Sequence, residues 1–146
     1  MRTRHVLALT IALATSLQSG AMAADIVVVV SARSHVQSLS EGEIKDIFLG
    51  RLARFPDGEA AIPMDQSYES PARAEFYRSV VHMSEAQVRA HWSKILFTGR
   101  GEPPEQFADA TRLAQRIADN PNAIGYLESD QVDARLRVIA RAPASR

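Results

Sequence analysis

The stretch best equipped to bind a small ligand covers residues 61–76, AIPMDQSYESPARAEF. Its candidate ligand groups are two hydroxyls, an amide, a guanidinium and a carboxylate, carried by Ser67, Ser70, Gln66, Arg73 and Asp65. Hydroxyl, amide and guanidinium groups donate hydrogen bonds to an oxyanion, and the guanidinium adds charge. The pattern therefore favours a small-anion site, although Asp65 and Glu69 bring negative charge to the same loop and Pro71 removes a backbone donor.

The local pattern predicts a strand over Ala60–Met64, a polar loop over Asp65–Glu69 and a helix that begins at Ser70-Pro71. Serine at the N-cap accepts an early backbone N–H, and proline at the first helical position loses only an N–H that had no partner. A strand that leads through a polar loop to a helix N-terminus suits an anion. An ordinary capped helix explains the same residues, and on the residues alone this plainer interpretation is favoured.

Enzyme chemistry finds little support in the chain. There is no cysteine, so thiolate nucleophiles and zinc–thiolate sites are excluded. The three histidines beyond the N-terminal segment, His35, His82 and His91, are not at metal-ligand spacing, and no G-x-S-x-G, P-loop or H-E-x-x-H motif is present. We therefore predict a non-enzymatic protein without a metal or cofactor.

The first 23 residues have the pattern of a cleaved secretory signal peptide. Arg2 and Arg4 precede an apolar run over Val6–Leu17, and Ala21-Met22-Ala23 is a small-x-small cleavage site. The run is too short to span a bilayer. We predict a signal peptide at 1–23, a folded domain at 24–146, a location outside the cytoplasm and no integral membrane segment.

Composition excludes some partners. Without the two leader arginines the chain has a formal charge of about −2 and no clustered basic patch, which excludes nucleic acid. The absence of cysteine leaves no thiol for lipid attachment and no disulfide, so a core must hold the exported domain together. We expect a freely soluble protein.

The rest of the chain alternates strand and helix signals. Two capping boxes, Ser40-x-x-Glu43 and Ser84-x-x-Gln87, start helices. Strands are predicted at Asp25–Val30, Ala60–Met64, Ala123–Leu127 and Leu136–Ala140, and further helices start at Pro71 (continuing to Met83) and after Asp109. This order predicts an α/β fold: a single compact domain with a mixed sheet of about four or five strands, Ile26–Val30 central, and flanking helices.

Three segments resemble phosphate ABC transporter substrate-binding proteins of the type 2 periplasmic-binding superfamily. Leu39–Gly50 (LSEGEIKDIFLG) is similar to the family segment LS-x-x-E-I/L-x-x-IF-x-G. Trp92–Gly101 (WSKILFTGRG) is similar to W-x-x-x-xFTG-x-G, and Asn120–Leu127 (NPNAIGYL) to NPGAIGY-V/L, with Asn122 where glycine is usual. The resemblance implies one lobe of a fold whose full-length members have two lobes that close on phosphate.

The resemblance also maps the family's phosphate loop, R-S-D-G-S-G-T, onto the opening stretch. Counting back from Phe76 places Gln66 at the arginine, Ser67 at the first serine, Tyr68 at the aspartate, Ser70 at the second serine and Pro71 at the glycine. The two serines are kept. The arginine and the aspartate are replaced, unless Asp65 and Arg73 substitute for them from neighbouring positions.

Two hypotheses follow. In the first, the protein is a periplasmic solute-binding protein that holds phosphate or another small oxyanion weakly or with a partner subunit, and serves an ABC permease. In the second, it is a non-catalytic periplasmic module that kept the fold and binds another protein, for which exposed Tyr68, Tyr126 or Trp92 would argue. If an anion binds, Ser70 and Arg73 are expected to hold it, and Arg73→Ala is expected to remove binding while leaving the fold nearly unchanged.

Overall fold

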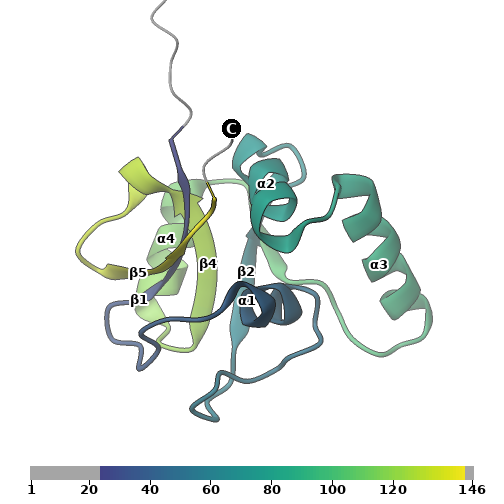
Figure 1. Ribbon diagram of the computed structural model, residues 1–146, viewed down its shortest axis with the longest axis horizontal. Helices are drawn as coiled ribbons and strands as arrows, with labels where there is room; N and C mark the ends of the chain where they lie inside the picture. Colours follow the sequence, from purple (N-terminus) through teal and green to yellow (C-terminus); the bar gives the residue numbers. More distant parts are fainter. Residues whose placement is uncertain (1–23, 144–146) are drawn as a thin grey trace, which may run out of the picture.

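Five strands form one mixed sheet in the computed structural model, which describes residues 24–143 (Figure 1). The strand order is β3-β2-β4-β1-β5. The elements are β1 (Ile26–Ser31), α1 (Glu41–Phe48), β2 (Ile62–Gln66), α2 (Pro71–Phe76), the π-helix η1 (Tyr77–Val81), α3 (Glu85–Phe97), β3 (Glu105–Phe107), α4 (Ala110–Asp119), β4 (Ala123–Glu128), the 3-10 helix η2 (Ser129–Gln131) and β5 (Leu136–Arg141). The predicted signal peptide lies outside the described residues.

Strand β1 is central, as its run of four valines predicted. It pairs antiparallel with β4 on one side and with β5 on the other, and each of its six residues is buried. Strand β2 pairs parallel with both β4 and β3, which makes the sheet mixed. A continuous β-branched run fits this position because both of its faces are covered.

Helices cover both faces of the sheet. Helix α4 packs its buried residues against one face, and it lies behind β1 and β4 in the view of Figure 1. Helices α1, α2, η1 and α3 contribute to the larger core on the other face. The α/β class, the single domain and the flanking helices are therefore confirmed. No helix within residues 24–143 is long and apolar enough to cross a bilayer.

The predicted helix starts are confirmed. Both capping boxes form: Ser40 and Ser84 each accept the backbone N–H of the residue three positions on, and that residue's side chain accepts the cap's own N–H. Helix α1 ends at Phe48, and Gly50, the residue after its C-cap Leu49, has φ 69°. A Cβ at Gly50 would lie 2.8 Å from Cη2 of Trp92, so the same glycine also admits the indole of α3.

The bounds of β2 differ from the prediction. The strand covers Ile62–Gln66 instead of Ala60–Met64, so Asp65 and Gln66 belong to the sheet and are buried. The reason is β3, a strand that the sequence did not predict because it has three residues and a single apolar one, Phe107. Its parallel pairing with Met64–Gln66 extends the sheet by two residues.

The predicted helix from Pro71 to Met83 is also corrected. Regular α-helix ends at Phe76 and continues as the π-helix η1, after which His82 adopts a left-handed conformation with φ 58°. The hydroxyl of Ser79 donates to the carbonyl of Glu75, and such i−4 bonds are a known cause of local helix distortion.

Candidate functional site

A pocket of about 380 Å³ lies where β2 ends and α2 begins. This is the junction that the sequence singled out. The lining residues are Gln66, Ser67, Glu69, Ser70, Pro71, Ala72, Ala108, Ala110, Glu128 and Gln131. The charged side chains in this lining are two carboxylates, Glu69 and Glu128. The structure therefore brings three of the predicted ligand residues to the pocket and places two others, Asp65 and Arg73, outside its wall.

Ser70 and Gln66 are already joined to each other and to the backbone. The hydroxyl of Ser70 donates to Oε1 of Gln66 at 2.6 Å and accepts the backbone N–H of Arg73 at 3.4 Å, as the N-cap prediction required. Nε2 of Gln66 donates to the carbonyl of Tyr126 at 3.1 Å. Both side chains serve first to fix the junction between strand and helix.

Ser67 has a different environment. Its backbone N–H donates to the carbonyl of Phe107, and its carbonyl accepts the N–H of Ser70. Its side chain is half-buried, and its hydroxyl makes no hydrogen bond within residues 24–143. Of the predicted site residues, Ser67 thus offers a hydroxyl that is free for a ligand.

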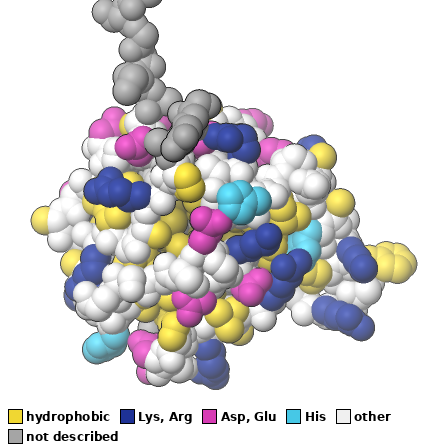
Figure 2. Space-filling view, in the orientation of Figure 1, with side chains coloured by type: hydrophobic (Ala, Val, Ile, Leu, Met, Phe, Trp, Pro, Cys, Tyr) yellow, Lys and Arg dark blue, Asp and Glu magenta, His cyan; other side chains and the backbone are white. Residues whose placement is uncertain are grey.

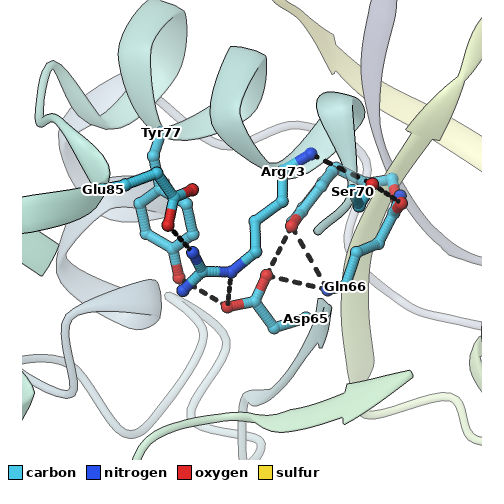
Figure 3. Close-up of polar contacts among 7 residues, drawn as sticks. Asp65, Gln66, Ser70, Arg73, Tyr77 and Glu85 are labelled. Atoms are coloured by element: carbon cyan, nitrogen blue, oxygen red, sulfur yellow. Dashed lines mark hydrogen bonds and ion pairs between the residues drawn. The ribbon is translucent and has the colours of Figure 1, made fainter. Parts of the chain in front are cut away.

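Asp65 lies beneath this junction, at the centre of a buried polar network (Figure 3). One carboxylate oxygen accepts from Nε of Arg73 at 3.2 Å and from the Tyr77 hydroxyl at 2.8 Å. The other accepts from the Tyr126 hydroxyl and from the Gln66 N–H. Burial raises the pKa of Asp65, and these partners oppose the rise. Asp65 is therefore not the repulsive loop charge that the sequence suggested.

Arg73 points into the same network (Figure 3). Its side chain is 1% exposed, and Nη1 forms an ion pair with Glu85 at the start of α3. The guanidinium carbon lies 4.3 Å from the ring centroid of Tyr68 and 4.6 Å from that of Tyr77. Burial lowers the pKa of Arg73, but Asp65 and the other acidic partners outweigh burial and raise it, so the group stays charged.

The burial of Arg73 changes one expectation. Truncating a buried, doubly paired guanidinium leaves the Asp65 carboxylate without its charge partner, so Arg73→Ala is expected to harm the fold. The burial of Arg73 thus replaces the earlier expectation of a nearly unchanged fold with an expected loss of stability. Arg73 as a ligand contact stays a prediction, and it requires the guanidinium to leave Glu85.

The sequence reasoning missed the residues that complete the network. Tyr77, Glu85 and Tyr126 lie 12, 20 and 61 positions after Asp65, on η1, α3 and β4. Their spacing carries no periodic signal. Tyr126 also stacks on Phe76, with ring centroids 3.9 Å apart. Glu128, the last residue of β4, and Gln131, in η2, also line the pocket. The sequence reasoning missed both of them.

Metal binding and aromatic contacts are two other kinds of chemistry open to such a site. Within the described residues, no group of three or more His, Cys, Asp or Glu side chains could hold a metal ion. Of the three aromatic residues considered for protein contacts, Tyr68 is 45% exposed, whereas Trp92 and Tyr126 are buried. The arrangement suits weak hydrogen bonding at the pocket and a rigid polar support beneath it.

Solved structures with this fold include phosphate-binding proteins of transport systems. An ABC-type phosphate transport receptor from Vibrio cholerae matches with a TM-score of 0.62 at 14% identity, over 80% of this chain and 45% of the receptor. A protein described as a phosphate ABC transporter substrate-binding protein with bound phosphate, from Clostridium perfringens, matches with a TM-score of 0.64 at 19% identity, over 80% and 45%. A possible phosphate binding protein from Planctomyces limnophilus matches with a TM-score of 0.56 at 13% identity, over 80% and 42%.

The chain therefore has the fold of one lobe of periplasmic phosphate-binding proteins, as the resemblance implied. It spans less than half the length of these structures. No protein-family model matches the chain. No curated protein matches it either.

Proposed function

We propose that the chain is a non-enzymatic periplasmic solute-binding domain of the phosphate-transport type, which holds phosphate or another small oxyanion weakly or together with a partner subunit. The observation that supports this most is the position of the pocket. It lies at the junction between β2 and α2, onto which the family's phosphate loop maps, and the fold is shared with phosphate-binding proteins. A cleaved leader would carry the domain to the periplasm, where an ABC permease or another protein is its partner.

Binding by the isolated domain is expected to be weak for electrostatic reasons. The guanidinium that could supply a charge-assisted contact is paired with Asp65 and Glu85 below the pocket. Glu69 and Glu128 line the pocket and repel a dianion. The Ser67 hydroxyl remains as the principal free donor, and a single neutral hydrogen bond contributes only about 0.5–1.5 kcal/mol.

A partner subunit would change this balance. The chain spans less than half the length of its structural neighbours, and a partner subunit that covered the pocket would enclose the site. Enclosure excludes water, and hydrogen bonds to an anion strengthen when water no longer competes for the donors.

An interaction module without a ligand is the second candidate, and Tyr68 favours it. This ring is 45% exposed beside the pocket and lies over the buried guanidinium of Arg73, so it is held rigidly. Rigid, exposed aromatic side chains are frequent anchors in protein–protein contacts.

Isothermal titration of the domain from Ala24 onward, against phosphate, sulfate and other oxyanions, tests the proposal. We expect saturable binding in the millimolar range that Ser67→Ala weakens several-fold. Ser93→Ala, at an exposed serine of α3, is the matched control and should leave binding unchanged. Submicromolar affinity that Ser67→Ala does not alter would place the site elsewhere, and the absence of saturable binding to every oxyanion would favour the interaction module.

A further inference from the structure

The C-terminal end of α3 carries the most exposed large hydrophobic side chains of the described chain. Phe97 is 94% exposed and Leu96 is 52% exposed. These two residues follow each other at the last turn of the helix, so they form one apolar tip. Such exposure of a phenylalanine side chain is unusual for a residue with no further role.

The tip stands away from the body of the domain. Figure 1 shows α3 at one side, with its lower end beyond the sheet and the other helices. The helix is attached through Val88 and Trp92, which are its buried residues. The tip is also ordered, since the hydroxyl of Thr98 donates to the carbonyls of Lys94 and Ile95 and so closes the helix end. Phe97 is therefore presented by a well-formed helix end.

Basic side chains lie along α3 and just beyond its C-terminal end. Arg89 lies on the helix face of Leu96, Lys94 is in the last turn, and Arg100 follows the helix; all three are exposed. None of them forms an ion pair within residues 24–143. Glu102 is the one acidic residue in the loop that follows. Figure 2 shows the projecting hydrophobic atoms over this helix with Lys and Arg side chains near them.

We propose that the tip of α3, defined as Leu96 and Phe97 with Arg89, Lys94 and Arg100, docks on the surface of an anionic phospholipid bilayer. The apolar pair enters the headgroup region, while the basic side chains remain at the level of the lipid phosphates. The interaction is reversible, because two apolar side chains and three positive charges are a modest anchor.

The shape of the tip favours a bilayer over a protein as its occupant. A stable protein interface buries about 1,200 Å² or more of total surface, usually over a complementary patch. Two side chains on a convex helix end supply only a small part of that area. A bilayer surface needs no matching groove, and its negative charge complements the three unpaired basic residues. This inference concerns a surface separate from the anion pocket.

Vesicle flotation tests the proposal with the chain from Ala24 onward, which contains every described element of the fold and lacks the apolar leader. Vesicles of equal parts phosphatidylglycerol and phosphatidylcholine should capture the protein, and vesicles of phosphatidylcholine alone should capture much less. Phe97→Ser should lower the partition coefficient about tenfold. Lys94→Gln with Arg100→Gln should lower it about twentyfold, and added salt should weaken binding in the same way.

Matched controls separate the tip from general effects. Ile62→Ser removes an exposed apolar side chain elsewhere, and Arg112→Gln with Arg116→Gln removes two exposed charges from α4. Both should bind vesicles as the wild type does, and circular dichroism should show that all variants are folded. The proposal is overturned if the wild type does not bind anionic vesicles, which would leave the tip to a protein partner. It is equally overturned if Phe97→Ser binds as well as the wild type.

Discussion

The two faces of the sheet are packed by different chemistry. The face covered by α4 is mostly aliphatic, with Phe107 among its core residues, and a Cβ at Gly125 of β4 would lie 2.4 Å from Cδ1 of Ile117. The other face holds rings and charges: Phe76 stacks on Tyr126, and the hydroxyl of Tyr126 leads to the buried pair of Asp65 and Arg73. The first face is held by apolar packing alone, whereas the second combines a larger apolar core with a network of polar partners.

This difference explains why the candidate site is weak in charge. The guanidinium and the carboxylate that the sequence offered to a ligand are used to bind α2 to β2 and to α3. What remains at the pocket is the hydroxyl of Ser67 with two carboxylates near it. A sequence can thus keep the residue types of an anion site while the fold uses them as structural support.

Breaking the polar network should have the largest effect on stability. Arg73→Ala removes the charge partner of Asp65 and leaves that carboxylate buried with only its hydrogen bonds from Tyr77, Tyr126 and the Gln66 N–H. We expect the free energy of unfolding to fall by about 3–5 kcal/mol, measured by urea denaturation. Arg89→Ala, which removes an exposed arginine from α3, should change it by less than about 0.5 kcal/mol. A loss of under about 1 kcal/mol in Arg73→Ala would mean that the pair adds little to the fold.

On the face covered by α4, a substitution should destabilise the fold through steric overlap instead. A Cβ at Gly125 would overlap Cδ1 of Ile117 and lie 3.3 Å from the carbonyl oxygen of Met64, so Gly125→Ala should cost about 1–3 kcal/mol. Ile117→Val removes that Cδ1 and alone should cost about 0.5–1.5 kcal/mol. Denaturation of the double variant should show a smaller loss than the two single losses together. Strict additivity would show that the overlap with Ile117 is not the cause.

These two faces also mark how far the sequence could predict the structure. The run of valines in β1, the capping boxes and the cap at Asp109 are local signals, and the elements they predicted are present. Each of these depends on neighbours in the chain, and local physics is enough for them.

The polar face depends on partners that are distant in the chain. Nothing around Asp65 in sequence indicates that Tyr126, 61 positions later, donates to it. The three-residue β3 was missed for the same reason: its pairing with β2, rather than its own composition, makes it a strand. Because β3 pairs with the end of β2, Asp65 and Gln66 lie in the buried sheet, whereas the sequence predicted them in a loop. The junction at which the pocket lies could be singled out from the sequence, but the use of its charged side chains could not.

A smaller difference in stability is expected between two N-cap serines, Ser70 at the pocket and Ser40 far from it. Ser70 caps α2 and also donates to the buried Gln66, whereas Ser40 caps α1 in an exposed capping box. Ser40→Ala should cost about 1 kcal/mol, the usual value of an N-cap. Ser70→Ala should cost about 1–2 kcal/mol, because Oε1 of Gln66 also loses its donor. Equal losses in thermal or urea unfolding would show that the bond to Gln66 adds nothing.

The ionisation of the two tyrosines on the polar face, Tyr77 and Tyr126, can be compared between the folded and the unfolded protein. Burial, followed by the nearby Asp65 carboxylate, raises the pKa of Tyr77 and of Tyr126 above the ordinary value of 10.0. The folded protein should therefore keep both phenols protonated at a pH where the unfolded chain, which has three tyrosines, ionises them. Since the unfolded state then releases more protons, stability should fall as the pH rises above about 10.

Phenolate absorbance measures this directly. At a pH slightly above 10, with circular dichroism showing that the protein is folded, the native chain should give less phenolate signal than the same chain in urea. Tyr77→Phe should leave the native signal unchanged, because Tyr77 does not contribute to it, but should reduce the signal in urea by that of one tyrosine. A native signal that drops in Tyr77→Phe would show that this hydroxyl ionises in the folded state and is not held by Asp65. In that case the polar face would be open to solvent, and the contrast with the dry aliphatic face would not hold.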